Sequence, residues 1–501
     1  MQLRWFRPYF RFAIAAALIA VSTVGAADPW APPGDLRLRH DLQLLADSGL
    51  LAAPLTTWPV AFGDIAANLT VPDDPRALAP AVRTALARVQ RRLRRESRTG
   101  VMNLGAMVSA AEEPIRLRSF ADTPREDAEA AVRVSGMGRF FAWRLQATAV
   151  SDPLDDKTYR LDGSYLGVAL GNWMFSYGQQ PRWWGPGWDG SLILGTAARP
   201  VPALVLERNR SDAFDLPVLH LLGPWKLVAF LGELEQDRFV PDAKLFGMRV
   251  TVKPTAQLEV GASRTAQWGG QGRSEDFDTF LDMLTGNDNF TRETAGPGRE
   301  NEPGNQLAGF DFRWQSPFLE RKPFALYGQL IGEDQGGNWP SHHIGLAGIE
   351  QWGQVGGRSY RIYLEAANTH AQFYKERTQY DFAYTHHIYR DGYHYYDRPL
   401  GHAADGDSRV YSLGLILAGD GDRLWSLQLQ RAALNTNGRD GRSPHSVSSN
   451  VRTDLDRILI THRRPLFGGD VDLGLGAVRL EADAETDTEV QAFLRWSVNW
   501  H

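Results

Sequence analysis

Two stretches of the chain carry residues whose types and spacing could do chemistry. The first, residues 178–200, places three tryptophans within six residues, and the second, residues 389–407, mixes aromatic rings with arginines and carboxylates. The C–H faces of sugars stack on aromatic rings, while carboxylates and guanidinium groups hold hydroxyls or uronate carboxylates in fixed directions. The two stretches therefore predict carbohydrate binding. The candidate contact residues are Trp183, Trp184, Trp188, Asp189 and Arg199 in the first stretch and Tyr393, Tyr395, Tyr396 and Arg398 in the second.

Catalytic and metal-binding patterns are much weaker. Cleavage of a glycosidic bond needs two carboxylates about 5–10 Å apart, and the spacing of the acids singles out no such pair. The chain also has no Gly-x-Ser-x-Gly elbow, no His-Glu-x-x-His motif and no phosphate loop. Asp405 and Asp407 with His402 could hold a cation, although one Asp-x-Asp is a weak metal signal. We therefore expect no catalytic residues, no metal and no cofactor.

In the segments that must position these stretches, apolar and polar residues alternate with a period of two. From Val101 onward, apolar and polar residues alternate in segments such as 141–149, 308–314 and 490–500. Strands of about 9–11 residues with an apolar outside and a polar inside suit a transmembrane barrel, which leaves no unpaired edge in lipid. A soluble β-sandwich alternates too, but here aromatic residues cluster at the ends of the apolar faces. We predict an all-β antiparallel barrel over residues 100–501, with 16 or 18 strands.

Composition agrees with a barrel. The chain has 501 residues, of which 43% are hydrophobic, yet its mean hydropathy is only −0.34. This pairing is typical of strands whose apolar and polar faces average out, and not of a helical membrane protein. Cysteine is absent, which excludes disulfides and thiol chemistry. An acidic balance (net charge −5) gives no basic surface for nucleic acid.

The N-terminal part of the chain has helical periodicity and an export signal. Residues 1–27 combine three arginines, a short apolar run and small residues before a cleavage point, so we expect a signal peptide that leads to the outer membrane. Residues 28–99 predict a small helical bundle. Asp35 is the expected N-cap of a helix that carries Leu38, Leu42 and Leu45 on one face. Further helices are expected near residues 62–69 and after Asp74 and Pro75.

Both chemistry-bearing stretches resemble the Wzi-type outer-membrane capsule assembly family. The run Trp-Trp-Gly-Pro-Gly-Trp-Asp-Gly-Ser-Leu-Ile-Leu at 183–194 is similar to that family's most recognisable stretch, and Gly392-Tyr-x-Tyr with Gly401-His-x-x-Asp-x-Asp is similar to its second. The early segments 38–49 and 54–59 also match its helical region. The resemblance implies an 18-stranded barrel with a periplasmic helical bundle. It also implies a surface lectin that helps attach or organise capsular polysaccharide.

Two questions stay open at the level of sequence. The tryptophans could instead pack a loop that closes the barrel lumen, with Arg182, Asp189 and Arg199 as a salt-bridge network that holds it. A substrate-specific porin uses the same architecture and is the alternative function. We predict a lectin-like protein of the outer membrane whose partners are surface polysaccharide and membrane lipid, with no nucleic acid, and which acts as a monomeric barrel.

Overall fold

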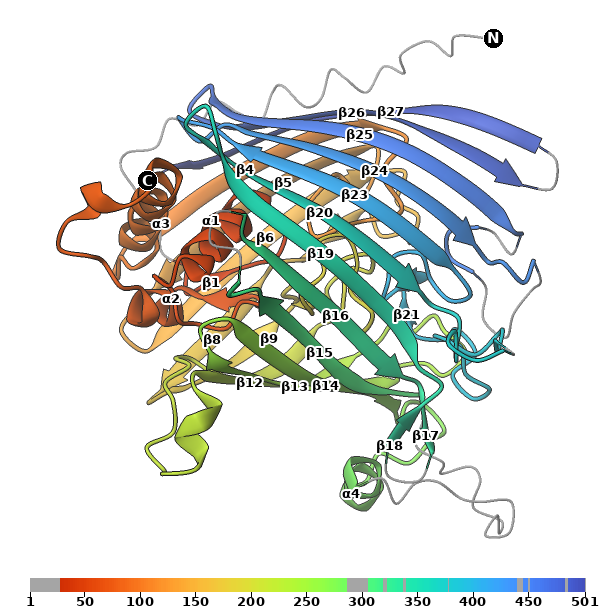
Figure 1. Ribbon diagram of the computed structural model, residues 1–501. Helices are drawn as coiled ribbons and strands as arrows, with labels where there is room; N and C mark the ends of the chain where they lie inside the picture. Colours follow the sequence, from red (N-terminus) through yellow and green to blue (C-terminus); the bar gives the residue numbers. More distant parts are fainter. Residues whose placement is uncertain are drawn as a thin grey trace.

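The strands of the β-rich region close into one antiparallel barrel (Figure 1). The computed structural model describes residues 28–285, 305–318, 322–336, 339–376, 378–438, 445–448, 451–482 and 485–500, so the expected signal peptide lies outside the described residues. The wall consists of β4 (Met102–Glu112), β5 (Ala128–Met137), β6 (Phe141–Ser151), β7 (Tyr159–Arg160), β8 (Tyr165–Leu170), β9 (Trp173–Gly178), β11 (Ala203–Arg208), β12 (Trp225–Glu233), β13 (Lys244–Thr255), β14 (Leu258–Trp268), β15 (Gln306–Gln315), β16 (Phe324–Gly332), β19 (Ile344–Val355), β20 (Arg358–Asn368), β23 (Arg409–Ala418), β24 (Leu424–Leu434), β25 (Thr453–Leu466), β26 (Gly469–Ala482) and β27 (Glu485–Trp500).

The strand number follows from the pairing. Of the nineteen wall strands in the described part of the chain, β7 and β8 both pair with β6 and share one position, which leaves eighteen. The barrel closes where β27 pairs with β4, with Trp500 opposite Leu104. The predicted all-β barrel is therefore confirmed, and 18 is the correct one of the two predicted strand numbers. Closure pairs the backbone N–H and C=O groups of both sheet edges, which lipid could not satisfy.

Side chains alternate between the outer face and the lumen as the sequence predicts. In β27, Val490 and Leu494 are 58% and 46% exposed, whereas Gln491 and Arg495 are buried. A soluble sandwich would bury its apolar face and expose its polar one. The reversed arrangement excludes that alternative. Among the described residues, no helix is long and apolar enough to cross a membrane.

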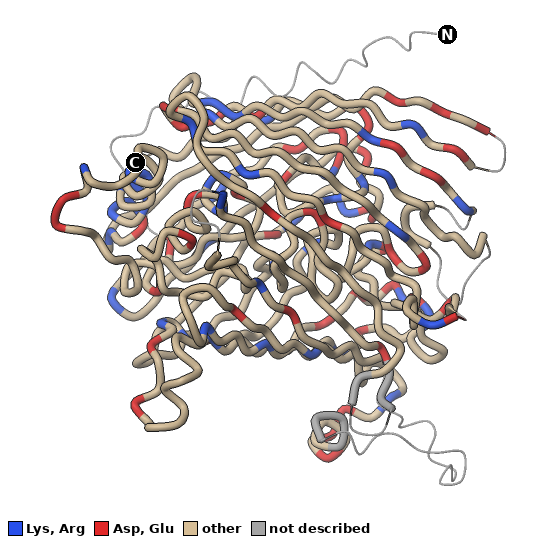
Figure 2. Tube along the Cα trace, viewed as in Figure 1, with Lys and Arg blue, Asp and Glu red and all other residues tan. Residues whose placement is uncertain are grey.

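The two ends of the barrel differ in their connections. One end has short turns, among them 171–172, 256–257, 356–357 and 467–468, and we call it the short-turn end. The other end has long connections, among them 113–127, 179–202 and 369–408, and we call it the long-loop end. Charged residues gather where β25–β27 approach the long-loop end, at the upper right of Figure 2. The central parts of these strands carry few charged residues.

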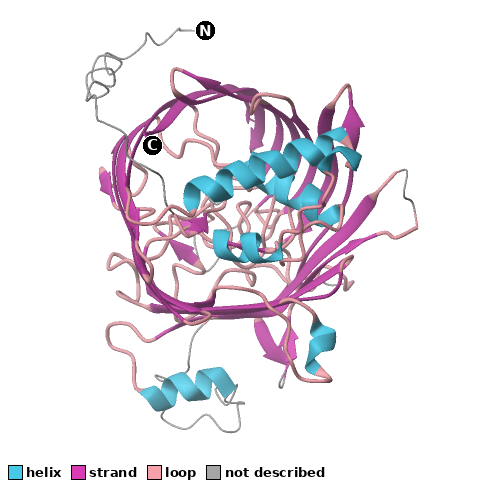
Figure 3. Ribbon diagram, turned by 90° about the vertical axis from the view of Figure 1, so that its left-hand side faces the viewer, coloured by secondary structure: helices cyan, strands magenta, loops and turns pink. Residues whose placement is uncertain are grey.

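The N-terminal helices lie at the short-turn end, across the mouth of the barrel (Figure 3). They are α1 (Leu36–Asp47), α2 (Phe62–Asn68) and α3 (Pro80–Glu96). The Asp35 carboxylate accepts a hydrogen bond of 3.1 Å from the Leu38 N–H, so the predicted N-cap is confirmed. The third helix begins later than predicted. Residues Pro75–Ala77 form a 3-10 turn, and Ala79 takes an extended backbone before Pro80, as residues before proline tend to do.

Several short elements complete the structure. They are β1 (Trp30–Ala31), β2 (Thr57–Trp58), β3 (Val60–Ala61), β10 (Trp183–Trp184), β17 (Asp334–Gly336), β18 (Trp339–Ser341), β21 (His394–Tyr395), β22 (Arg398–Pro399) and α4 (Phe277–Thr285). Most of these short pairs lie off the wall. One of them, β10 with β2, joins the loop system to the N-terminal region.

Candidate carbohydrate-binding loops

The tryptophan-rich stretch turns into the barrel instead of projecting from it. We call residues 179–202, between β9 and β11, the Trp loop. Its strand β10 pairs with β2, so that Trp183 lies opposite Trp58 and Trp184 opposite Thr57. The Gly185 N–H donates to the Thr56 carbonyl at 2.9 Å. A loop that leaves the wall at the long-loop end thus joins the segment that follows α1, and the two fill the lumen together.

Aromatic rings lock this junction. Trp58, Phe120 and Trp183 are almost fully buried and meet edge to face, with ring centroids 5.0 and 5.5 Å apart. The guanidinium carbon of Arg39 in α1 lies 4.3 Å from the Phe120 ring and 4.1 Å from the Trp188 ring. A desolvated cation–π contact contributes about 2 kcal/mol. Helix, Trp loop and the 113–127 loop therefore share one core.

The turn at the tip of the Trp loop is bound by a carboxylate of the wall. Glu365 in β20 accepts hydrogen bonds from the backbone N–H groups of Trp188 at 2.8 Å and Gly190 at 2.6 Å. The Tyr327 hydroxyl donates to the same carboxylate at 2.8 Å. Backbone N–H groups in the lumen need such acceptors because unsatisfied buried donors are costly. The position of Glu365 on the polar face of its strand makes this contact possible.

Asp189 is fixed in the same region by neutral donors. Its carboxylate is 3% exposed and accepts from the Ser412 hydroxyl at 2.5 Å and from the Gln430 amide at 2.7 Å. Gln428 donates to it as well. The guanidinium of Arg457 in turn donates to the Gln428 side-chain oxygen at 3.0 Å. Three neighbouring strands thereby hold one residue of the Trp loop.

A buried charge network ties α1 to the wall. Asp47, the last residue of α1, forms ion pairs of 2.8 Å with both Arg313 and Arg361. Glu350 binds the same two arginines at 2.6 and 2.7 Å, and the Trp188 indole N–H donates to Glu350 at 2.7 Å. Paired, hydrogen-bonded charges of this kind are retained in a buried site, whereas removal of one partner is strongly destabilising. The helix, the Trp loop and three strands meet in this network.

The tyrosine-rich stretch covers the Trp loop on the side of the long loops. We call residues 369–408, between β20 and β23, the Tyr loop. The Tyr384 hydroxyl donates to the Leu192 carbonyl at 2.6 Å, and the Tyr393 hydroxyl donates to the Ile193 carbonyl at 2.9 Å. Both tyrosines are fully buried. The two stretches that the sequence singles out are therefore brought together, one stacked on the other.

This stacking divides the predicted contact residues into two groups. Six of them are buried between the loops and the wall: Trp183, Trp184, Trp188, Asp189, Tyr393 and Tyr395. The other three, Arg199, Tyr396 and Arg398, are partly exposed at the long-loop end. These three lie together around a small cavity of about 20 Å³, which Arg125, Glu126 and Asp155 also line. A cavity of this size holds a water molecule and not a sugar ring.

Arg199 is held rigidly at this cavity. Its guanidinium donates two hydrogen bonds of 2.9 Å to Asp162 and one of 2.6 Å to Asp155. Burial alone lowers the pKa of Arg199, but these two carboxylates outweigh burial and raise it above its ordinary range. The guanidinium carbon lies 5.1 Å from the Tyr396 ring. Arg199 therefore helps to position the Tyr396 ring, beside which Tyr395 and Lys157 also lie.

Arg398 differs from Arg199 in having no partner. Among the described residues, its side chain forms no hydrogen bond and no ion pair, although Glu126 and Asp155 line the same cavity. Burial and, to a lesser extent, the positive charge of Arg125 lower its pKa to about 10, against the opposing effect of Glu126. A guanidinium that forms no ion pair at a partly exposed site can bind an anion of a ligand. A bidentate carboxylate is the anion that a guanidinium fits best.

The acidic part of the Tyr loop is committed to internal contacts. The Asp405 carboxylate lies 2.8 Å from the His394 Nε2 atom. This interaction lowers the pKa of Asp405 despite the opposing effect of burial. Asp407 accepts a hydrogen bond of 2.8 Å from the Asp381 N–H.

Three residues that line the cavity, Arg125, Glu126 and Asp155, were not singled out from the sequence. The available signal was the group of arginines at positions 116, 118 and 125, which lie in the connection between β4 and β5.

Comparison with known proteins agrees with this architecture. Residues 98–493 match the family model described as capsule assembly protein Wzi. A Klebsiella pneumoniae protein, described as an uncharacterized 55.8 kDa protein in the cps region, is 34% identical over 429 residues, which cover 84% of this chain and 81% of that protein. The Escherichia coli protein Wzi, described as an outer membrane protein involved in group 1 capsule assembly and a carbohydrate-binding β-barrel, has a TM-score of 0.80 at 29% identity, over 94% of this chain and 99% of that chain. The chain belongs to the Wzi family of capsule assembly proteins and is a β-barrel of the outer membrane.

Proposed function

We propose that this protein binds surface polysaccharide with its long-loop end and helps to attach or organise the polymer at the cell surface. The observation that carries the proposal is the unpartnered Arg398 beside the half-exposed Tyr396 ring. An aromatic face and a free guanidinium are the two groups that an acidic sugar requires. The solved E. coli relative is described as carbohydrate-binding, which supports the same function here.

The proposal includes an orientation of the barrel. We assign the short-turn end and the helical region, residues 28–99, to the periplasm, and the long-loop end to the outside. Short periplasmic turns and long outer loops are the rule for barrels of the bacterial outer membrane. One chain suffices for this arrangement because β27 pairs with β4 of the same chain. Membrane lipid then contacts the apolar outer face directly.

The buried aromatic residues act indirectly in this proposal. Trp183, Trp184 and Trp188 hold the Trp loop against the wall, and Tyr393 holds the Tyr loop on top of it. Both loops are therefore ordered before a ligand arrives, so that binding does not have to order them. Direct contact is assigned to Tyr396 and Arg398, and Arg199 is a positioning residue for the Tyr396 ring.

A porin function is the alternative, and the lumen argues against it. The Trp loop, the Tyr loop and α1 interlock in the barrel interior through short hydrogen bonds. Steady conductance of the purified wild-type protein in a planar bilayer would support a porin. A closed barrel should give none.

Retention of purified surface polysaccharide from the producing strain tests the proposed function. The full-length protein in detergent should retain the polymer, and the Arg398→Ala and Tyr396→Ala variants should each lose at least tenfold in affinity. Arg139→Ala is the matched control, because Arg139 lies in the turn between β5 and β6 at the opposite end. If both loop variants retain the polymer as wild type does, the proposed site is wrong.

A further inference from the structure

The outer face of the barrel has its own hollow, on the side of the wall that is opposite to the lumen. A depression of about 820 Å³ lies across β19, β20 and β23–β27. The side chains that point outward into it include Leu364, Tyr411 and Ile458, which are 53%, 59% and 44% exposed. Residues of the same strands that point into the lumen, such as Glu365, contribute only the floor. The hollow therefore faces lipid and has no connection with the proposed polysaccharide site.

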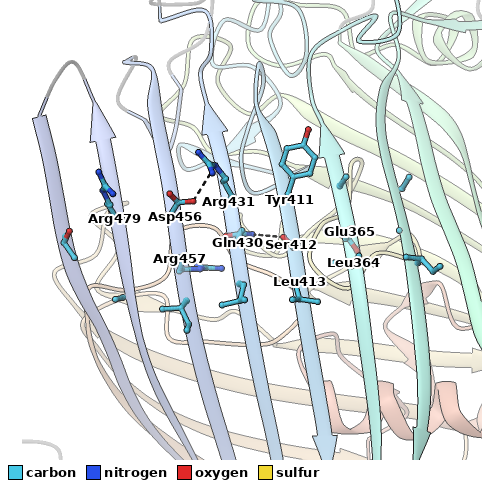
Figure 4. A pocket seen from close by; sticks show the side chains of 18 residues that line it. Leu364, Glu365, Tyr411, Ser412, Leu413, Gln430, Arg431, Asp456, Arg457 and Arg479 are labelled. Carbon is cyan, nitrogen blue, oxygen red and sulfur yellow. Dashed lines mark hydrogen bonds and ion pairs between the residues drawn. The ribbon is translucent and has the colours of Figure 1, made fainter.

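Register places its residues in two parallel rows (Figure 4). Tyr411, Arg431, Asp456, Arg479 and Thr488 stand opposite one another on successive strands from β23 to β27. The row two residues nearer the barrel centre is wholly apolar. Its members are Leu364, Leu413, Leu429, Ile458, Ala477 and Val490.

The polar row contains charges on a surface that lipid covers. The Arg431 and Arg479 side chains are 80% and 57% exposed; Arg431 pairs loosely with Asp456, at 3.7 Å, and Arg479 pairs with Glu481 on its own strand. An outward arginine costs about 2–4 kcal/mol at the bilayer midplane and almost nothing at the interface. The row therefore marks the headgroup level. It lies three residues from the long-loop ends of β24, β25 and β26.

We infer that this hollow is a binding site for an acylated, phosphate-bearing glycolipid of the outer leaflet, namely lipopolysaccharide. The apolar row accommodates an acyl chain, and Arg431 and Arg479, on alternate strands about 10 Å apart, bind phosphate groups. Guanidinium groups suit phosphate because they donate parallel hydrogen bonds. Asp456 lies between them, and because exposed ion pairs such as Arg431 with Asp456 and Arg479 with Glu481 contribute little free energy, a phosphate can replace these carboxylates. The inference uses the proposed orientation of the barrel but does not need polysaccharide binding.

The chemistry favours this occupant over an ordinary phospholipid. Two separated cations in one row match a headgroup with two separated phosphates, whereas a phospholipid offers one. The next row outward holds a third exposed cation, Arg409 in β23, together with the acids Asp454 and Glu481. A multiply acylated lipid also fills a wide hollow that spans several strands better than a two-chain lipid does.

Native mass spectrometry of the full-length barrel in detergent tests the inference. The probe is purified rough lipopolysaccharide, which has two lipid phosphates and no long polysaccharide. We expect stoichiometric retention by wild type and at least a tenfold loss in the Arg431→Ala/Arg479→Ala variant. Arg464→Ala is the matched control, since Arg464 is exposed on β25 near the short-turn end. Heat-modifiable migration on gels reports whether each variant is folded.

Several outcomes would overturn the site. They are absence of retention by wild type, equal retention of dephosphorylated lipopolysaccharide or of phosphatidylglycerol, and an equal loss in Arg464→Ala. The single variants Arg431→Gln and Arg479→Gln keep the test decisive if the double variant does not fold. Because the probe lacks the surface polymer, failure here is distinct from failure of polysaccharide binding. The Arg398→Ala variant should retain the lipid fully.

Discussion

The carboxylate of Glu365 in the barrel wall accepts a hydrogen bond of 2.6 Å from the backbone N–H of Gly190 in the Trp loop, 175 residues away in sequence. The same carboxylate also accepts from the N–H of Trp188 at 2.8 Å. One wall side chain therefore satisfies the backbone at the deepest turn of the loop. Loss of this acceptor should affect the closure of the lumen more than the stability of the barrel.

We expect the Glu365→Ala variant to open the lumen. Each buried N–H that loses its acceptor costs about 1–3 kcal/mol, so the Trp loop should leave its closed position. In planar bilayers the variant should give steady single-channel conductance where wild type gives none. Glu112→Ala, an exposed acid at the end of β4, is the control and should stay closed. A closed Glu365→Ala barrel would mean that the loop does not depend on this contact.

The sequence predicts the wall well because its signal is local. Alternation with a period of two assigns Val490 and Leu494 to the outside and Gln491 and Arg495 to the inside without knowledge of any partner strand. The N-cap at Asp35 is equally local, since donor and acceptor are three residues apart. These features could therefore be predicted from the residues alone.

The interior could not be predicted in the same way. The pairing of Trp183 with Trp58 joins segments 125 positions apart, and no pattern near either residue specifies the other. Aromatic residues in a long loop are compatible with stacking on sugar and with packing in a core. Burial separates these roles: Tyr393 is fully buried, whereas Tyr396, three residues later, is partly exposed.

The Asp47→Ala variant should release the helical region from the wall. Asp47 pairs with Arg313 and Arg361, and removal of one partner of a buried ion pair costs about 3–5 kcal/mol. Release should loosen the backbone of α3, whose arginines are already partly exposed, so limited trypsin digestion should cut within residues 80–96 at least tenfold faster. Asp73→Ala, at an exposed position of the same region, should be cut at the wild-type rate. Equal rates for both variants would contradict the role of the network.

Polysaccharide binding should depend on carboxylates of the polymer and on salt. Reduction of these carboxylates to alcohols should weaken binding to wild type by tenfold or more, and should have little further effect on Arg398→Ala. The screening length falls from about 8 Å at 0.15 M salt to about 3 Å at 1 M, so added salt should weaken binding of wild type most. Glycan-array or biosensor titrations measure both effects. Salt-independent binding would exclude Arg398 as the anion contact.

The Tyr loop has a buried acid whose ionisation opposes folding. Burial and, to a lesser extent, the carboxylates of Asp381 and Asp405 raise the pKa of Asp407 from an ordinary value of 3.8 to about 7, against a hydrogen bond from the Asp381 N–H. The folded loop thus binds a proton that the unfolded loop releases. Such a group stabilises the loop most at low pH, and its contribution is lost as the pH rises from about 4 through 7.

The Asp407→Asn variant should therefore gain stability relative to wild type as the pH rises. The amide keeps an oxygen that accepts from the Asp381 N–H but cannot ionise. Hydrogen exchange in residues 369–408, corrected for the intrinsic rate, should be much slower in the variant at pH 8 and slower by a smaller factor at pH 5. The histidines of the loop are common to both proteins, so their contributions cancel in the difference. Asp420→Asn, in an exposed turn, should follow wild type. A constant difference between Asp407→Asn and wild type across this range would show that Asp407 does not titrate there.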